Sequence, residues 1–224
     1  MAATNGNQRA AVDLYRWNVE LSGAVYEALH VVEVVLRNAV DRQLSAWNST
    51  QTSPSTGRPH SSEWLRDPSR LLRRLVREKD LRLAQERARR TIGGRPPTHG
   101  DIIAQMSFGT WRYLMPDRDP GRQLLWREAL HKAFPYLTNH PPHSIAQHRH
   151  RSSPQEELVG SIDGLYRLRN RVAHLEPLLR LGRMKDQLNN IRFVSGAINP
   201  EIRDWLESTQ RISAVLDGLP HQGS

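Results

Sequence analysis

Apolar residues recur at intervals of three and four positions along most of the chain, and this spacing restricts the fold more than any other feature of the sequence. The longest such stretch runs from about Arg9 to Trp47, and no proline interrupts it. Its apolar positions are Leu14, Trp17, Leu21, Ala24, Ala28, Val31, Val35, Ala39 and Val40. This period is typical of an amphipathic helix. Because no stretch alternates as a strand would, we expect an all-α protein.

Capping residues predict where further helices begin. Four segments place a Ser, Thr, Asp or Asn ahead of an apolar run, two of them with the spacing of a capping box: 67–68, 98–101, 153–156 and 199–200. We therefore expect helices over about 67–91, from 98 until Pro116, and over 123–134, 154–175, 184–198 and 199–216.

The length of 224 residues suits one large domain or two small ones, and we expect a single helical domain over 1–224. Two segments should be loop-like insertions. The first, 48–62, is rich in Ser, Thr, Pro and Gly, so we expect it to be weakly ordered. The second, 135–152, contains His140, His143, His148 and His150 without the pattern of a metal site. Residues 221–224 should form a tail.

The charge balance favours polyanionic partners. The formal net charge is +9, and only Lys79, Lys132 and Lys185 among the 32 basic residues are lysines. Arginine binds phosphate through two parallel hydrogen bonds, which points to nucleic acid or anionic lipid. Coding bias in a GC-rich genome would also produce many arginines. The basic run that includes Arg73, Arg74 and Arg77 is either a solvated helix face or a surface for RNA.

The absence of cysteine excludes disulfides, thiolate zinc sites and cysteine nucleophiles. No apolar run approaches the ~20 residues that a membrane span needs, and the first nine residues lack an apolar signal segment. We therefore expect a cytoplasmic chain with no membrane association and no cofactor.

The stretch Arg167-Leu168-Arg169-Asn170-Arg171-Val172-Ala173-His174 concentrates guanidinium groups and an imidazole on one expected helix. Helix geometry puts Arg167, Asn170 or Arg171, and His174 on one polar stripe. Arg169 lies about 140° around the helix from His174. It would join the stripe only through its long stem, through an irregular helix, or from a second copy of the chain.

The pattern Arg169-Asn170-x-x-x-His174 resembles the Arg-x4-6-His motif of HEPN domains. Two further blocks resemble the abortive-infection (Abi-like) branch of that family: the first helix, from Leu14 through Ala39, and Met106-Ser107-Phe108-Gly109-Thr110-Trp111. The resemblance implies a HEPN-like helical bundle with additional helices and loop insertions. It also implies a homodimer with a composite active site. Many such proteins are metal-independent endoribonucleases of phage defence or toxin–antitoxin systems that leave a 2′,3′-cyclic phosphate and a 5′-hydroxyl.

The resemblance, read with the residue types, suggests a role for each motif residue. Histidine transfers protons near neutral pH, so His174 would be the acid or base, whereas Arg169 would hold phosphate and Asn170 would orient the imidazole or the phosphate. Glu33, Arg37 and Asn38 on the first helix would support the motif. Arg167 and Arg171 would make further contacts with RNA. Alternatively, Arg169 and Arg171 only pair with acids such as Glu176 or Asp163, and His174 only caps the helix C-terminus.

Three functions remain open from the sequence. The leading hypothesis is an endoribonuclease effector of phage defence or of a toxin system, restrained by an antitoxin or acting with a defence-system partner. The second is a non-catalytic RNA-binding or phage-sensing module with the same fold. The third is a protein-interaction subunit of a defence complex.

Overall fold

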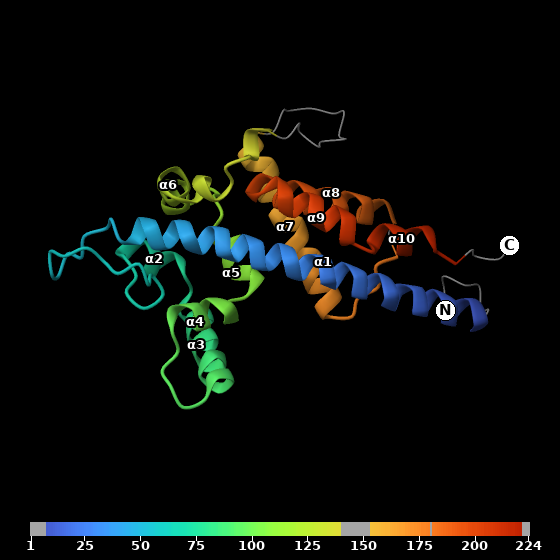
Figure 1. The fold of residues 1–224 in the computed structure, drawn as a ribbon, viewed down its shortest axis with the longest axis horizontal. Helices are drawn as coiled ribbons and strands as arrows, with labels where there is room; N and C mark the ends of the chain where they lie inside the picture. The colour runs from blue at the N-terminus through green and yellow to red at the C-terminus, as the bar shows by residue number, and fades with distance from the viewer. Residues whose placement is uncertain (1–7, 140–152, 180, 221–224) are drawn as a thin grey trace. The chain divides into compact units, whose positions relative to one another are not determined.

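The computed structural model describes residues 8–139, 153–179 and 181–220, and the regular structure in these ranges is helical (Figure 1). Between them the described segments contain no β-strand, only an isolated bridge that pairs Thr52 with Pro59. The expectation of an all-α protein is confirmed. No helix in the described part of the chain has both the length and the apolar character needed to cross a membrane.

Helix α1 (Gln8–Asn48) is the long N-terminal helix that the apolar spacing predicts. The chain groups into two compact units that share this helix. Unit 1 contains residues 1–33 and 138–224, and unit 2 contains residues 34–137. Each unit is described separately below.

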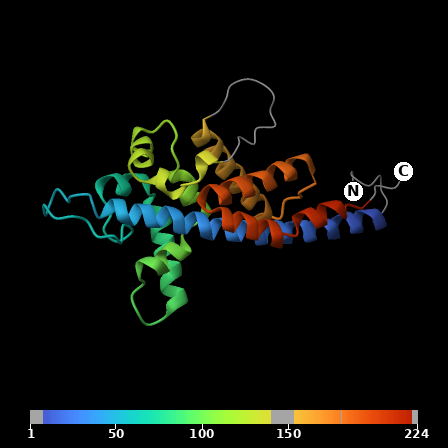
Figure 2. The same cartoon turned by 45° about the horizontal axis from the view of Figure 1, so that its top comes forward.

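Unit 1 contains four further α-helices: α7 (Pro154–Ala173), α8 (Leu181–Ile198), α9 (Pro200–Thr209) and α10 (Ile212–Asp217). Helix α8 packs beside both α7 and α9, as Figure 2 shows for the orange and red segments. The indole nitrogen of Trp17 on α1 donates to the carbonyl of Val215 on α10 at 2.7 Å. Arg211, at the start of α10, pairs with Glu27 on α1 at 2.7 Å.

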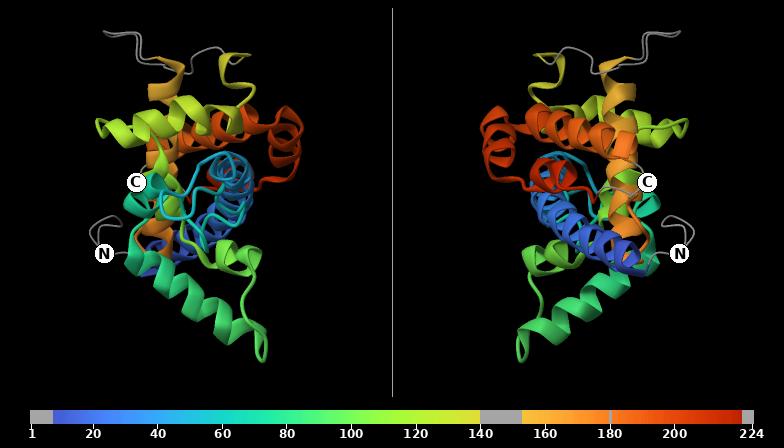
Figure 3. Two further views of the ribbon diagram at one scale, coloured as in Figure 1. Left: turned by 90° about the vertical axis from the view of Figure 1, so that its left-hand side faces the viewer. Right: turned by 90° about the vertical axis from the view of Figure 1, so that its right-hand side faces the viewer.

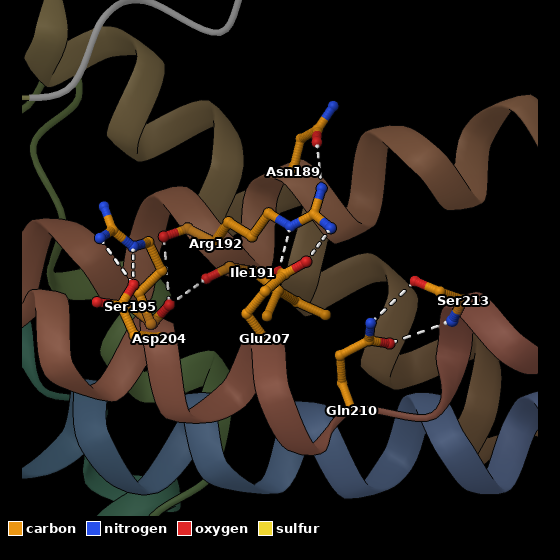
Figure 4. Close-up of polar contacts among 9 residues, drawn as sticks. Asn189, Ile191, Arg192, Ser195, Asp204, Glu207, Gln210 and Ser213 are labelled. Carbon is orange, nitrogen blue, oxygen red and sulfur yellow. Dashed lines mark hydrogen bonds and ion pairs between the residues drawn. The ribbon is translucent and has the colours of Figure 1, made fainter.

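Arg192 and Glu207 join α8 to α9 (Figure 4). Both nitrogens of the Arg192 fork donate to the Glu207 carboxylate at 2.5 Å, and Arg192 also donates to Asn189 at 3.2 Å. The sequence predicted one continuous helix over 199–216, but the structure has a break between α9 and α10. Gln210 has extended backbone angles there, and its side chain accepts from the Ser213 amide, so a new helix starts.

Unit 2 contains the last part of α1 and six shorter helices. These are α2 (Arg70–Leu75), α3 (Glu78–Ile92), α4 (His99–Gln105), α5 (Phe108–Leu114), α6 (Pro120–Glu128) and the 3₁₀ helix η2 (Leu130–Ala133); a 3₁₀ turn, Leu137–Asn139, follows. Helices α3 and α4 pack side by side as a hairpin, which Figure 3 shows from two sides. The expected capping box of Thr98 and Asp101 is present at the start of α4.

Two expected helices are each broken in unit 2. The predicted helix over 67–91 is divided because Val76 and Arg77 have extended backbone angles. Asp67 does not cap it; its carboxylate accepts from the Ser61 amide at 2.8 Å and from His60 at 2.9 Å, which lowers the pKa of Asp67 below its ordinary value. Similarly, extended residues at Met106 and Ser107 separate α4 from α5.

The segment 48–62 is more fixed than its composition indicates. Asn48, fully buried at the end of α1, donates to the carbonyls of Ser61 and Asp67 at 2.6 and 2.9 Å. Its side-chain oxygen accepts from the Ser69 amide at 2.9 Å. One amide side chain at the start of the loop therefore closes it by satisfying backbone groups at and beyond its other end. Most of the expected insertion at 135–152, with its four histidines, lies outside the described residues. The expected tail at 221–224 also lies outside them.

Candidate functional site

Helix α7 carries the motif and has the predicted start. Ser153 and Glu156 form the capping box, with Pro154 in the first turn. The buried positions of α7 follow the expected three- and four-residue spacing: Leu158, Ser161, Ile162, Leu165, Leu168 and Val172. This apolar stripe fixes the rotation of the helix, and therefore which side chains of the motif face away from the core.

The end of α7 is a Schellman turn with leucine where glycine is usual. His174 is the C-cap, and Leu175 follows with φ of 58°. The Leu175 amide donates to Val172 at 3.1 Å and the Glu176 amide donates to Arg171 at 2.9 Å, which are the two hydrogen bonds of that turn. The Leu175 side chain is 90% exposed. The left-handed backbone therefore carries a steric cost that no burial of the side chain offsets.

The three motif residues have no polar partner for their side chains among the described residues. His174 is exposed, and Arg169 and Asn170 are half-buried. The His174 backbone amide donates to the carbonyl of Asn170, so His174 caps the helix through its backbone. Its imidazole makes no hydrogen bond or ion pair within the described ranges. Arg169 stays on a different side of α7 from His174, because α7 is regular through the motif.

Arg167 and Arg171 are committed to ion pairs. Arg167 pairs with Asp163 one turn earlier on α7. Arg171 pairs with Glu176 at 3.3 Å and donates to the carbonyl of Pro177, so it holds the chain that leaves the helix. The alternative that Arg169 and Arg171 only pair with acids such as Glu176 or Asp163 thus holds for Arg171 and not for Arg169, and the pairing of Arg167 with Asp163 is an addition to it.

A cleft of about 490 Å³ lies between α7 and α8, entirely within unit 1. Arg167 and Arg171 line it from α7, and Arg183 lines it from α8. Helix geometry puts Arg169 about 140° around α7 from Gly164, another lining residue, so Arg169 faces away from the cleft. The link from α7 to α8 is anchored where the Leu178 amide donates to Asn18 on α1 at 2.7 Å.

The first-helix residues fall in both units. Glu33 belongs to unit 1 and is half-buried. Arg37 and Asn38 belong to unit 2, where Arg37 donates to the Asn38 side chain at 3.4 Å and to the carbonyl of Ala104, near the end of α4, at 3.5 Å. A cation at a helix C-terminus is favourable. Arg37 therefore contributes to the structure of unit 2.

Two of the three arginines proposed from the basic run are paired in unit 2. Arg74 forms a bidentate pair with Asp119 at 2.8 Å, which lowers the pKa of Asp119. Arg77 pairs with Asp80 at 2.7 Å and lies 4.8 Å above the ring of Tyr113. Arg73 is exposed, and its side chain makes no hydrogen bond or ion pair in the described part of the chain. It is the most available of the three for an anion.

The lining of the cleft includes residues that sequence reasoning did not select. They are Gly160, Gly164, Arg183, Gln187 and Asn190. The available signal was the pair of glycines one turn apart on an otherwise apolar and charged helix. Their partners on α8 had no sequence signal, because the cleft exists only where the two helices pack.

Comparison with known proteins yields no match: no protein-family model fits the sequence, no curated protein is detectably similar, and no solved structure aligns with the fold. The described residues therefore define an all-α protein whose α7 carries an unpaired Arg-Asn-xxx-His motif beside a basic cleft.

Proposed function

We propose that the chain is a HEPN-type endoribonuclease that cleaves RNA at the C-terminal end of α7 without a metal ion, as an effector of phage defence or of a toxin system. The observation that carries the proposal is the contrast within one helix. Arg167 and Arg171 are paired, whereas Arg169, Asn170 and His174 have no polar partner in the described residues. Polar side chains without partners remain available to contact a substrate, and His174 lies three residues beyond Arg171, which lines the basic cleft.

The residue types match the chemistry of RNA cleavage. The ribose 2′-oxygen forms a bond to phosphorus while the bond from phosphorus to the 5′-oxygen breaks. A base takes the 2′-hydroxyl proton, and an acid gives a proton to the departing 5′-oxygen, which leaves a 2′,3′-cyclic phosphate and a 5′-hydroxyl. His174 serves as one of these groups. Arg169 neutralises the negative charge that develops on the phosphorane.

Arg169 and His174 lie on different sides of α7, which favours a site shared by two copies of the chain. In such a homodimer Arg169 of one subunit acts with His174 of the other. Mixing His174→Ala with Arg169→Ala protein tests this directly. Recovery of activity in the mixture, from two inactive parents, is expected; a mixture as inactive as its parents argues against a shared site.

The defining experiment is RNA cleavage in EDTA with the full chain. Wild type is expected to cut labelled RNAs, including tRNA, to products that end in cyclic phosphate, and His174→Ala should lower the rate at least about 100-fold. His30→Ala and Arg89→Ala are matched controls, because both side chains are exposed and make no hydrogen bond or ion pair within the described segments. Absence of cleavage by wild type on varied RNAs, or an active His174→Ala protein, would refute the proposal.

A non-catalytic RNA-binding module is the second candidate, favoured by the same separation of Arg169 from His174 around α7. It is distinguished by RNA binding that weakens with salt and survives His174→Ala, with no cyclic-phosphate product. A protein-interaction subunit would dimerise without measurable affinity for RNA.

A further inference from the structure

The cleft between α7 and α8 is lined by cations from both helices. Arg167 and Arg171 already have carboxylate partners, whereas Arg183 is exposed and makes no hydrogen bond or ion pair with a described residue. Asp186 is the one acid in the lining. Asp163 and Glu176 offset the charges of Arg167 and Arg171, so Arg183 is the guanidinium group of this lining that remains available to bind an anion.

The α7 wall of the cleft is bare backbone at two positions. A β-carbon at Gly164 would lie 2.9 Å from the side-chain nitrogen of Asn190 and 3.3 Å from the side-chain oxygen of Gln187, so this glycine leaves room for the ends of these two side chains of α8. A β-carbon at Gly160 would meet nothing within 4 Å. The cleft is therefore open at Gly160, and at its narrow part the Asn190 side-chain nitrogen donates to the Gln187 side-chain oxygen at 3.3 Å, which leaves the Gln187 side-chain nitrogen as a further donor.

The cleft lies close to the motif along α7. Arg171 precedes His174 by three residues, which corresponds to about 60° of rotation and about 4.5 Å of rise. A strand that crosses the end of α7 can thus contact His174 and the cleft at once, whereas Arg169 faces the other way.

We infer that the α7–α8 cleft binds a phosphodiester of the RNA strand next to the one that is cleaved, with Arg183 as its principal cation. The inference rests on the proposed function, because it takes RNA as the ligand. Arg183 is a positioning residue, and the side-chain nitrogen of Gln187 donates to a remaining phosphate oxygen.

The test is RNA binding in a cleavage-deficient His174→Ala background, measured by fluorescence anisotropy with a short labelled single-stranded RNA. Arg183→Gln is expected to weaken binding about tenfold, as expected for loss of one charged hydrogen-bonding group. It should also reduce the slope of log K against log salt by about 0.7. Lys185→Gln is the matched control, because this exposed lysine on the same helix does not line the cleft.

A second variant tests the space instead of the charge. A leucine at position 160 has room for its side chain and favours the helix more than glycine does, so the Gly160→Leu protein should fold. Its side chain should fill the cleft and weaken RNA binding several-fold. Equal effects of Arg183→Gln and Lys185→Gln, with normal binding by Gly160→Leu, would overturn the inference. The inference would also be overturned if Arg183→Gln weakened the binding of AMP but left the binding of RNA unchanged.

The two proposals fail in different ways. If wild type cleaves RNA and the cleft variants bind like their parent, the cleft assignment is wrong and the nuclease proposal stands. If the chain binds no RNA at all, both are wrong.

Discussion

Arg171 and Glu176 lie on either side of the end of α7 and form an ion pair of 3.3 Å across the Schellman turn. A hydrophobic contact often links the corresponding two positions of this turn. Here a charge pair replaces it, and Arg171 also donates to the carbonyl of Pro177. Arg171 therefore fixes the path of the chain where it leaves α7, and this holds the backbone of His174 in place.

Leu175→Gly should stabilise the protein. Leu175 is the only non-glycine residue with positive φ in the described ranges, and its side chain is 90% exposed. Glycine removes the steric cost of the left-handed backbone but makes the unfolded chain more flexible, so we expect a net gain of about 0.5–1 kcal/mol in the free energy of unfolding. Urea denaturation measures it. Leu179→Gly, at a residue without positive φ, should give no gain; a loss at Leu175 equal to that at Leu179 would contradict the prediction.

The two glycines of the α7 wall should respond oppositely to leucine. Gly160→Leu meets open space and gains helix propensity, so the free energy of unfolding should rise by about 0.5–1 kcal/mol. Gly164→Leu would force Asn190 and Gln187 away and should lower it by about 1–3 kcal/mol. Thermal unfolding followed by circular dichroism compares the two. Equal shifts in the same direction would show that the Asn190 and Gln187 side chains move aside without cost.

Asp41 anchors a buried polar cluster in unit 2. One of its carboxylate oxygens accepts from Trp64 at 2.7 Å and from His99 at 3.0 Å, and the His99 ring packs edge-on against Trp64. Asp41→Ala leaves two buried donors unpaired, and we expect a loss of about 2–3 kcal/mol in urea denaturation followed by tryptophan fluorescence. Asp204→Ala removes an exposed carboxylate paired only with its neighbour Arg203, and should cost less than about 1 kcal/mol. Similar losses in both variants would count against this role for Asp41.

Stability should fall on acidification through Asp119. Hydrogen bonds from Arg74, then from the Arg122 amide, lower the pKa of Asp119. A lowered folded-state pKa contributes stability that is present above the unfolded value of about 3.9 and is lost as pH falls towards the folded value. The urea midpoint should therefore drop between about pH 5 and pH 2.

Asp119→Asn keeps the shape of the cap on α6 but should flatten that drop. Asp13→Asn removes an exposed carboxylate that makes no hydrogen bond or ion pair in the described part of the chain, so it should leave the drop unchanged. An Asp119→Asn profile as steep as wild type would assign the acid sensitivity to other carboxylates.

Apolar periodicity and capping residues predicted well those helix boundaries that depend on local sequence. The start of α7 at Ser153-Pro154, the capping box of α4 and the length of α1 are confirmed. The breaks at Val76-Arg77, Met106-Ser107 and Gln210 were not predicted. No proline or glycine marks them, and propensity alone does not reveal where tertiary packing makes a helix turn.

The sequence by itself determined the all-α class, the position of the motif near the end of α7, and the separation of Arg169 from His174, because each follows from helical periodicity along a single segment. Only the tertiary structure decided that Arg171 pairs with Glu176 beyond the helix end, and that α8 places Arg183, Gln187 and Asn190 opposite the α7 glycines. Those relations join residues from separate helices or from beyond a helix end. They depend on how the helices pack and how the chain leaves α7, which the spacing of residues within one helix does not specify.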